Sequence, residues 1–181
     1  VIMYMFIKKE KVNHFGEIII GFGVLFLGIS LMGAAVEPLK ESVEGQHMFA
    51  SLSNPFIALL IGWLVTGIIQ SSSVTVSIIV VLASKGMFNE NLIICLFIIL
   101  GCNMGACMTA LLTSLSGKKD ARRAAMIHFL FNLVGSTIMF LLLTFFGDFI
   151  QNLLYNTVSK GHAGNYIANS QTIFKIVQVA I

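Results

Sequence analysis

Residues 67–77, with the sequence GIIQSSSVTVS, place one amide and three consecutive hydroxyl groups in the middle of an apolar segment. The surrounding residues 50–84 include no Asp, Glu, Lys or Arg. Polar side chains in such a segment need hydrogen-bond partners, because an unpaired polar group in apolar surroundings raises the free energy of the folded state. Two structures are compatible with this pattern: a helical hairpin with the polar residues at its tip, and one straight helix whose serines bond to the preceding turn.

The composition is that of a membrane protein. Hydrophobic residues make up 57% of the chain and charged residues 10%, whereas soluble domains have roughly 25% charged residues. Four uncharged stretches, 18–36, 50–84, 91–117 and 124–147, have about the length needed to cross a bilayer. We therefore expect an all-α, multi-pass protein of the cell membrane, inner or plasma, in contact with the lipid bilayer. The net charge of +3 is small and lies in short loops, so we expect no nucleic-acid partner.

The basic residues indicate how the chain is oriented. Residues 8–11 and 118–123 contain the main basic clusters, so the positive-inside rule places both on the cytoplasmic side. The glutamates of residues 37–44 then lie outside. The acidic loop and the second basic cluster lie on opposite sides, so the chain between them crosses the membrane an odd number of times. It has two apolar segments there, 50–84 and 91–117. One of these two segments is therefore expected not to cross.

Helix lengths favour the first of these segments as the one that turns back. Asn54 and Pro55 form a helix start, with a capping residue followed by proline at the first helical position. A helix over 56–69 is about 21 Å long, and one over 74–83 about 15 Å. Neither reaches the roughly 30 Å of a bilayer core. The arithmetic predicts a re-entrant hairpin at 54–84.

The serines at the tip have the chemistry of an anion site. Ser71, Ser72 and Ser73 stand where the second helix of the hairpin would begin. Free backbone N–H groups and the positive end of the helix dipole both favour an anion there, and a tetrahedral oxyanion fits this arrangement. Gln70 adds two amide donors, and its carbonyl oxygen is able to help to ligate a cation.

A second polar interruption lies in the following apolar segment. Residues 101–105, Gly-Cys-Asn-Met-Gly, place an asparagine between two glycines. Glycine in a helix interior is about 1 kcal/mol less favourable than alanine, so the pattern predicts local unwinding. Unwound carbonyl groups, the Asn103 oxygen and the Thr109 hydroxyl would suit Na⁺, in the manner of secondary transporters. The alternative is that the glycines allow close helix packing and Asn103 makes an interhelical bond.

Other chemistry is not indicated. The three cysteines all fall in one apolar segment without metal-type pair spacing, so we expect them to pack in the core. A serine hydrolase needs a base beside its nucleophile. No Gly-x-Ser-x-Gly motif surrounds the serines, and His128 is the only histidine deep in an apolar segment. We expect no enzyme, no catalytic residue, no cofactor and no metal beyond sodium as coupling ion.

Four stretches together resemble a known family. They are FGEIIIGFGVLFLGISLM at 15–32, TGIIQSSSVTVSIIVVLASKG at 66–86, LGCNMGACMTALLTSLSG at 100–117 and ARRAAMIHFLFNLVGS at 121–136. In order and spacing they resemble one repeat of the type II Na⁺/phosphate cotransporter family. The preceding basic stretch and the run Phe-Leu-Gly-x-x-Leu-Met are more similar to the second repeat of bacterial members than to the first.

The resemblance implies how the chain is organised. Two inverted repeats in that family each contribute one Gln-Ser-Ser motif to a central site. The whole chain, 1–181, is then a fragment that holds one transmembrane repeat and half of the site. The other half is expected from a second repeat of the same chain or from a homodimer partner. The expected elements are a transmembrane helix at 16–36, the hairpin at 54–84, a broken transmembrane helix at 90–116, a transmembrane helix at 121–147 and the start of a further helix at 164–181.

The resemblance also implies a function, sodium-coupled symport of inorganic phosphate by alternating access. The candidate phosphate ligands are Gln70, Ser71, Ser72 and Ser73. The candidate sodium ligands are Gln70, Ser73, Thr75, Asn103 and Thr109. His128 and Asn132, four residues apart on one helix face, match a His-x-x-Phe-Asn element of the family and are expected to form a structural polar pair.

Three positions depart from the family pattern. Ala106 stands where the family has a threonine, and Gln171 and Lys175 replace a histidine and an asparagine in a segment similar to Ala-x-x-His-Thr-x-Phe-Asn. These departures favour an alternative function, a non-transporting membrane regulator or a decayed half-repeat that keeps the fold. The intact polar tip of the hairpin favours transport.

Overall fold

The structure is a computed structural model that describes residues 10–42, 52–88, 91–159 and 161–180. Within these residues all regular structure is helical, which confirms the predicted all-α class. The elements are α2 (Glu10–Glu41), α4 (Pro55–Ile69), α5 (Ser72–Ser84), α6 (Ile93–Ser114), α7 (Lys119–Leu153), the π-helical turn η1 (Leu154–Val158) and α8 (Ala163–Ala180). The expected start of a helix at 164–181 corresponds to α8. The apolar sequence of residues 1–7 also predicts the tail of an earlier helix, and these residues lie outside the described part of the chain.

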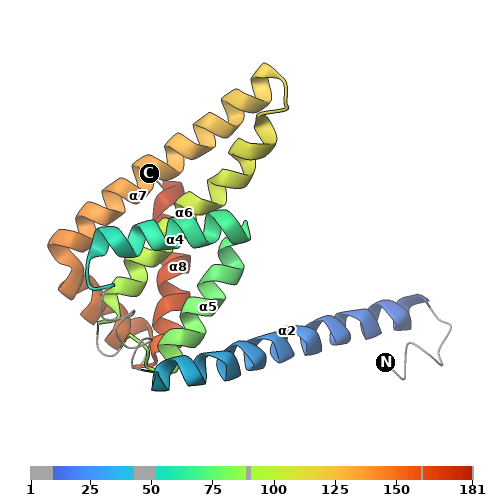
Figure 1. Ribbon diagram of the computed structural model, residues 1–181, viewed down its shortest axis with the longest axis vertical. Helices are drawn as coiled ribbons and strands as arrows, with labels where there is room; N and C mark the ends of the chain where they lie inside the picture. Colours follow the sequence, from blue (N-terminus) through green and yellow to red (C-terminus); the bar gives the residue numbers. More distant parts are fainter. Residues whose placement is uncertain (1–9, 43–51, 89–90, 160, 181) are drawn as a thin grey trace.

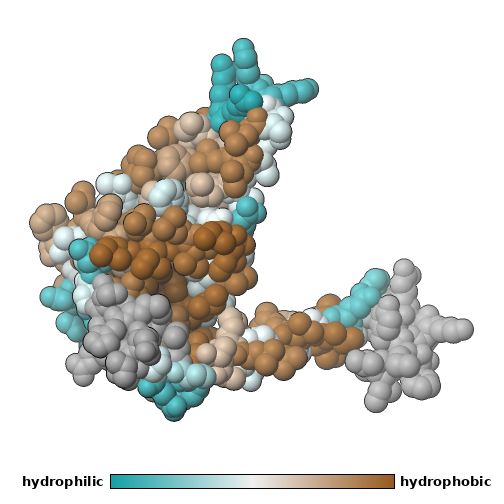
Figure 2. Space-filling view, viewed as in Figure 1, coloured by the Kyte–Doolittle hydropathy of each residue, from teal (hydrophilic) through white to brown (hydrophobic). Residues whose placement is uncertain are grey.

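Three helical stretches in the described part of the chain are long and apolar enough to cross a membrane. They are His14–Pro38, Ile93–Ser114 and Lys119–Val158. Figure 2 shows that hydrophilic residues gather near the C-terminal end of α2 and at the turn between α6 and α7, with hydrophobic surface between them. This distribution confirms the multi-pass membrane protein predicted from composition.

The apolar segment around the serines forms two short helices instead of one straight helix. Asn54 caps α4, because its Oδ1 accepts from the backbone N–H of Phe56 at 2.9 Å and Pro55 occupies the first helical position. The helix ends at Gln70, whose backbone is left-handed. Ser71 then caps α5. Figure 1 shows α4 and α5 meeting at a sharp angle, as two arms joined at the polar tip.

The predicted break at 90–116 is wrong, because α6 is continuous from Ile93 to Ser114. Its glycines serve close packing against α4, as the alternative interpretation had it. A Cβ on Gly105 would lie 2.7 Å from the Trp63 carbonyl oxygen, and one on Gly101 would collide with the Leu59 carbonyl oxygen. The opposed glycine on α4, Gly62, faces the Ile98 carbonyl in the same way. Contact between the two backbones offsets the poor helix propensity of glycine.

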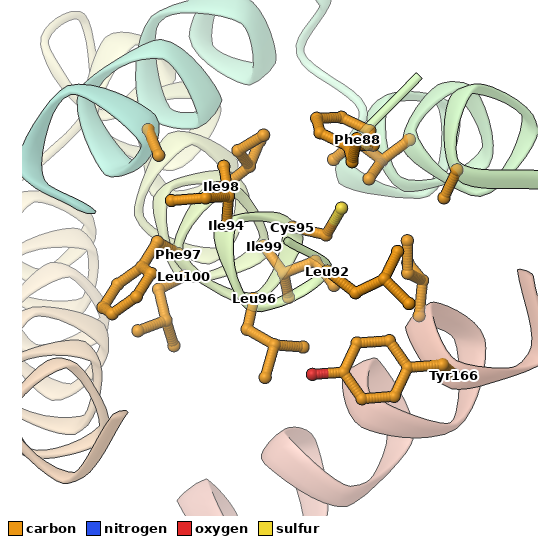
Figure 3. Close-up of a cluster of buried hydrophobic side chains, with 14 of the residues drawn as sticks. Phe88, Leu92, Ile94, Cys95, Leu96, Phe97, Ile98, Ile99, Leu100 and Tyr166 are labelled. Carbon is orange, nitrogen blue, oxygen red and sulfur yellow. The ribbon is translucent and has the colours of Figure 1, made fainter. Parts of the chain in front are cut away.

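Helix α6 is the centre of the core. Figure 3 shows its side chains pointing outward in several directions, with Tyr166 of α8 on one side. Phe97 meets Phe140 of α7 edge to face, with ring centroids 5.2 Å apart. Cys95, Cys102 and Cys107 are free and buried in this helix, so they pack in the interior.

Helix α2 projects from the rest of the molecule and approaches it only near its C-terminal end (Figure 1). There the Nζ of Lys85, at the end of α5, lies 2.6 Å from Glu37 Oε2. The pair joins the end of α2 to the end of the hairpin. Both ends would then lie on one side of a membrane, which is the arrangement that the odd number of crossings requires.

The placement of the hairpin in the membrane leads to a labelling prediction. Asn91 is exposed in the turn before α6, close in sequence to Lys85. We expect a cysteine at Asn91 to react with impermeant thiol reagents from the outside, and a cysteine at Lys119 only from the cytoplasm. The buried native cysteines should give little background. Labelling of Asn91→Cys from the cytoplasm would show that the 54–84 segment crosses the membrane completely.

Candidate functional site

The hairpin tip is built by one left-handed residue and one capping serine. Gln70 has φ 57° and ψ 22°, which turns the chain out of α4. Ser71 is extended, and its Oγ accepts from the backbone N–H of Val74 at 3.4 Å. As an acceptor in the cap, this hydroxyl keeps its own proton for a ligand. The local sequence therefore produces both the turn and the helix start.

Ser72 and Ser73, the first two residues of α5, provide hydrogen-bond donors at the tip of the hairpin. Their backbone N–H groups have no acceptor within the helix, because the first turn of an α-helix has no preceding turn to bond to. Ser71 and Ser72 are half-buried, whereas Gln70 and Ser73 are exposed. The dipole of α5 adds partial positive charge at the same point. Amides, hydroxyls and dipole together suit an anion.

The candidate sodium ligands do not form one cluster. Thr75 is buried, and its hydroxyl donates to the Ser71 carbonyl oxygen at 3.1 Å. Thr109 lies four residues beyond Gly105, and so on the side of α6 that faces α4. Asn103 lies on the opposite side of α6 from Gly101 and Gly105, because two residues correspond to about 200° of helical rotation. The structure therefore directs Asn103 to α8.

Asn103 is buried and is hydrogen-bonded to α8. Its Oδ1 accepts from Nε2 of Gln171 at 3.4 Å. The sequence pattern treated Gln171 only as a departure from the family, and it contained no signal that the two residues, 68 positions apart, would meet. Interhelical hydrogen bonds of this type are a recurring feature of membrane helix packing.

A groove beside the hairpin connects Gln171 with the serines. It has a volume of about 420 Å³ and lies between α2, α5 and α8. Its lining residues are Ile29, Ser73, Val76, Ser77, Val80, Val81, Ala168 and Gln171. Ser77 is the second residue that the sequence reasoning missed. Its position four residues after Ser73, on the same helix face, was the available signal.

The predicted polar pair on α7 is connected through the backbone of His128. Asn132 is buried, and its Nδ2 donates to the His128 carbonyl oxygen at 2.9 Å. Its Oδ1 accepts from Nε2 of Gln178 on α8 at 3.0 Å. Asn132 thus makes the interhelical bond, while the exposed His128 contributes its carbonyl oxygen. Of the three departures, Ala106 is half-buried on α6 and Lys175 is exposed on α8.

The fold defines a class, the all-α multi-pass membrane proteins, here with two short helices beside the long ones. The chain belongs to the Na⁺/Pi-cotransporter family, whose model matches residues 35–154. This confirms the family that the four sequence stretches resembled. No solved structure matches the chain.

Three relatives illustrate the range of the similarity. The "Uncharacterized protein YqeW" of Bacillus subtilis is 27% identical over 97% of this chain and 55% of its own length. The "Putative inorganic phosphate export protein YjbB" of Escherichia coli is 31% identical over 77% of this chain and 25% of its own length. The "Sodium-dependent phosphate transport protein 2C" of Rattus norvegicus is 34% identical over 65% of this chain and 20% of its own length. The chain therefore spans about half the length of the first relative and a smaller part of the other two.

Proposed function

We propose that this chain forms half of a site for sodium-coupled symport of inorganic phosphate across the membrane by alternating access. The main support for a phosphate site is the start of α5. There the Ser71 side chain caps the helix through Val74, and the backbone N–H groups of Ser72 and Ser73 remain free at the tip of a hairpin. Gln70 to Ser73 would hold the phosphate. The name of the rat relative describes sodium-dependent phosphate transport, which supports the coupling ion. The name of the E. coli relative describes export, so the direction of transport is part of the test.

Sodium would act by lowering the free energy of phosphate in the site. An anion taken from water into a low-dielectric interior is strongly destabilised unless a charge of opposite sign accompanies it. A cation near Asn103, on the side of α6 that faces α8, would supply that charge. Each ion would then increase the affinity of the site for the other, which is the thermodynamic basis of coupled transport.

A second half of the site would cover the tip. Gln70 and Ser73 are exposed in this chain, and Ile68 beside them is 82% exposed. Polar backbone at membrane depth is tolerated only where it is buried in protein or lines a watery cavity. We propose that a second repeat of the same protein covers the tip, with an inverted second copy of the chain as the other possible source.

The test is phosphate flux in proteoliposomes that contain the full-length protein. We expect an inward sodium gradient to drive radioactive phosphate uptake, and uptake to fall when potassium replaces sodium. An outward flux that requires sodium on the same side as phosphate would assign the export direction. Phosphate flux independent of sodium would refute the coupling, and no flux in either direction would favour the non-transporting regulator.

Two substitutions should separate the anion side of the site from the cation side. Ser72→Ala removes a hydroxyl at the start of α5, and a hydrogen bond to a charged group contributes about 1.5–3 kcal/mol. We expect the half-saturating phosphate concentration to rise about 10- to 100-fold, with little change in that for sodium. Asn103→Ala should instead raise the half-saturating sodium concentration about tenfold, as loss of groups that support an ion site does. Wild-type half-saturating concentrations of phosphate and sodium in both variants would contradict the proposed site.

A further inference from the structure

Gln171 of α8 carries a buried oxygen that lacks a hydrogen-bond partner. Its Nε2 donates to Asn103, but its Oε1 is buried and has no partner among the described residues. Leaving a buried acceptor unpaired is unfavourable by about 1–3 kcal/mol. Such an atom in a folded protein calls for a water, an ion or a ligand.

The Gln171 side chain lines the groove between α2, α5 and α8. The other polar side chains of that wall are Ser73 and Ser77, both on α5, and the rest of the wall is apolar. A water molecule occupies about 30 Å³ in the liquid, so a groove of about 420 Å³ has room for an ion that keeps part of its hydration shell.

The hydrogen bonds determine the sign of the charge that the groove prefers. The Ser77 hydroxyl donates its one proton to the Ser73 carbonyl oxygen at 2.9 Å. Toward the groove it therefore offers only lone pairs. The orphan Oε1 of Gln171 is also an acceptor. Gln171 Oε1 and Ser77 Oγ thus give the groove two acceptors, which favour a cation, and neutral oxygen ligands suit a hard ion such as Na⁺.

We propose that Gln171 Oε1 and Ser77 Oγ are ligands of the coupling sodium ion, and that Asn103 is a positioning residue that holds the Gln171 amide. This rests on the proposed sodium-coupled function and specifies its cation site. Ser77 lies one helical turn after Ser73, so the ion would sit about 6 Å along α5 from the phosphate at its N-terminus. Attraction between the two ions at that separation would couple their binding.

Gln178 provides a matched control for Gln171. It lies on the same helix two turns further, is buried, and its Nε2 donates to an asparagine oxygen in the same way. It is outside the set of residues that line the groove. Replacing either glutamine removes one interhelical amide bond, but only Gln171 should affect the ion.

The test is equilibrium binding of radioactive sodium, without phosphate, to the purified full-length protein. We expect Gln171→Met and Ser77→Ala to weaken sodium affinity about tenfold or more, a loss typical of damaged ion sites. Gln178→Met should stay within about twofold of the wild-type affinity. Gln171→Glu keeps the oxygen and adds negative charge, so it should bind sodium at least as tightly as the wild type. If Gln171→Met does not fold, the glutamate variant decides the question.

Distinct outcomes would overturn distinct claims. Wild-type sodium affinity in Gln171→Met, or loss of sodium binding in a folded Gln171→Glu, would refute the cation site and leave the proposed function standing. If Gln171→Met keeps the wild-type sodium affinity but binds phosphate more weakly, Gln171 Oε1 would instead be assigned as an acceptor for a protonated phosphate oxygen. A wild-type protein that binds no sodium would refute the sodium coupling of the proposed function.

Discussion

Replacing Gly105 with Leu is expected to separate α4 from α6 and to unfold the hairpin under conditions in which the wild-type protein is intact. Even a Cβ at this position would lie 2.6 Å from the Thr66 Cβ and 2.7 Å from the Trp63 carbonyl oxygen. Backbone cannot move away as a flexible side chain does, so the two helices must part along their contact. Overpacking of a well-packed interior typically destabilises by about 1–3 kcal/mol, and backbone collision places this substitution at or above the upper end.

The measurement is the midpoint of thermal unfolding in detergent, together with the fraction of protein that elutes as a single species in size-exclusion chromatography. Gly21→Leu on α2 is the matched control, because a Cβ there has no heavy atom within 4 Å. Leucine is also a better helix former than glycine, so this control should be neutral or slightly stabilising. A Gly105→Leu protein with the wild-type midpoint would contradict the tight packing of the two helices.

Replacing Gln70 with Gly is expected to abolish most phosphate transport without destabilising the protein. Gln70 is the one non-glycine residue with positive φ among the described residues. A left-handed backbone is unfavourable by roughly 1–2 kcal/mol for residues with a Cβ, and glycine adopts it freely. Glycine would therefore suit the turn better than glutamine does. A strained residue at a polar tip points to a function of its side chain.

Loss of the Gln70 amide should reduce the apparent phosphate affinity about 10- to 100-fold, the equivalent of one or two charge-assisted hydrogen bonds. Phosphate uptake in proteoliposomes and thermal unfolding should be measured on the same preparations. Gln70→Asn is the control, because asparagine tolerates the left-handed backbone and keeps a shorter amide. Its transport should lie between those of the wild type and the glycine variant. Wild-type transport by Gln70→Gly would show that the residue serves only the turn.

Much of the hairpin was predictable because helix caps are local. The Asn54 cap contacts residues two and three positions away, and the Ser71 cap a residue three positions away. Contacts this short follow from residue type and spacing, which explains why the hairpin boundaries at 54–84 lie close to those of α4 and α5. The apolar stretches were equally readable, because bilayer thickness sets the length of a helix that crosses it.

The two glycines of α6 were misinterpreted because their effect depends on a neighbour. Gly101 and Gly105 are unfavourable in an isolated helix, and from that the sequence predicted unwinding. In the folded protein they face the backbone of α4, some forty residues earlier in the chain, and the contact stabilises a continuous helix. Periodicity within one segment carries no information about which segment lies opposite.

Composition, charge distribution and capping residues were thus sufficient for the membrane class and for the two short helices of the hairpin, because each depends on residues close together in the chain. Tertiary packing alone paired Gln171 with Asn103 and Gln178 with Asn132, across 68 and 46 positions. It also turned Asn103 away from α4 and placed Ser77 and Gln171 on one groove. The direction in which a helix face points is set by the helices packed around it, and that arrangement arises only when the whole chain has folded.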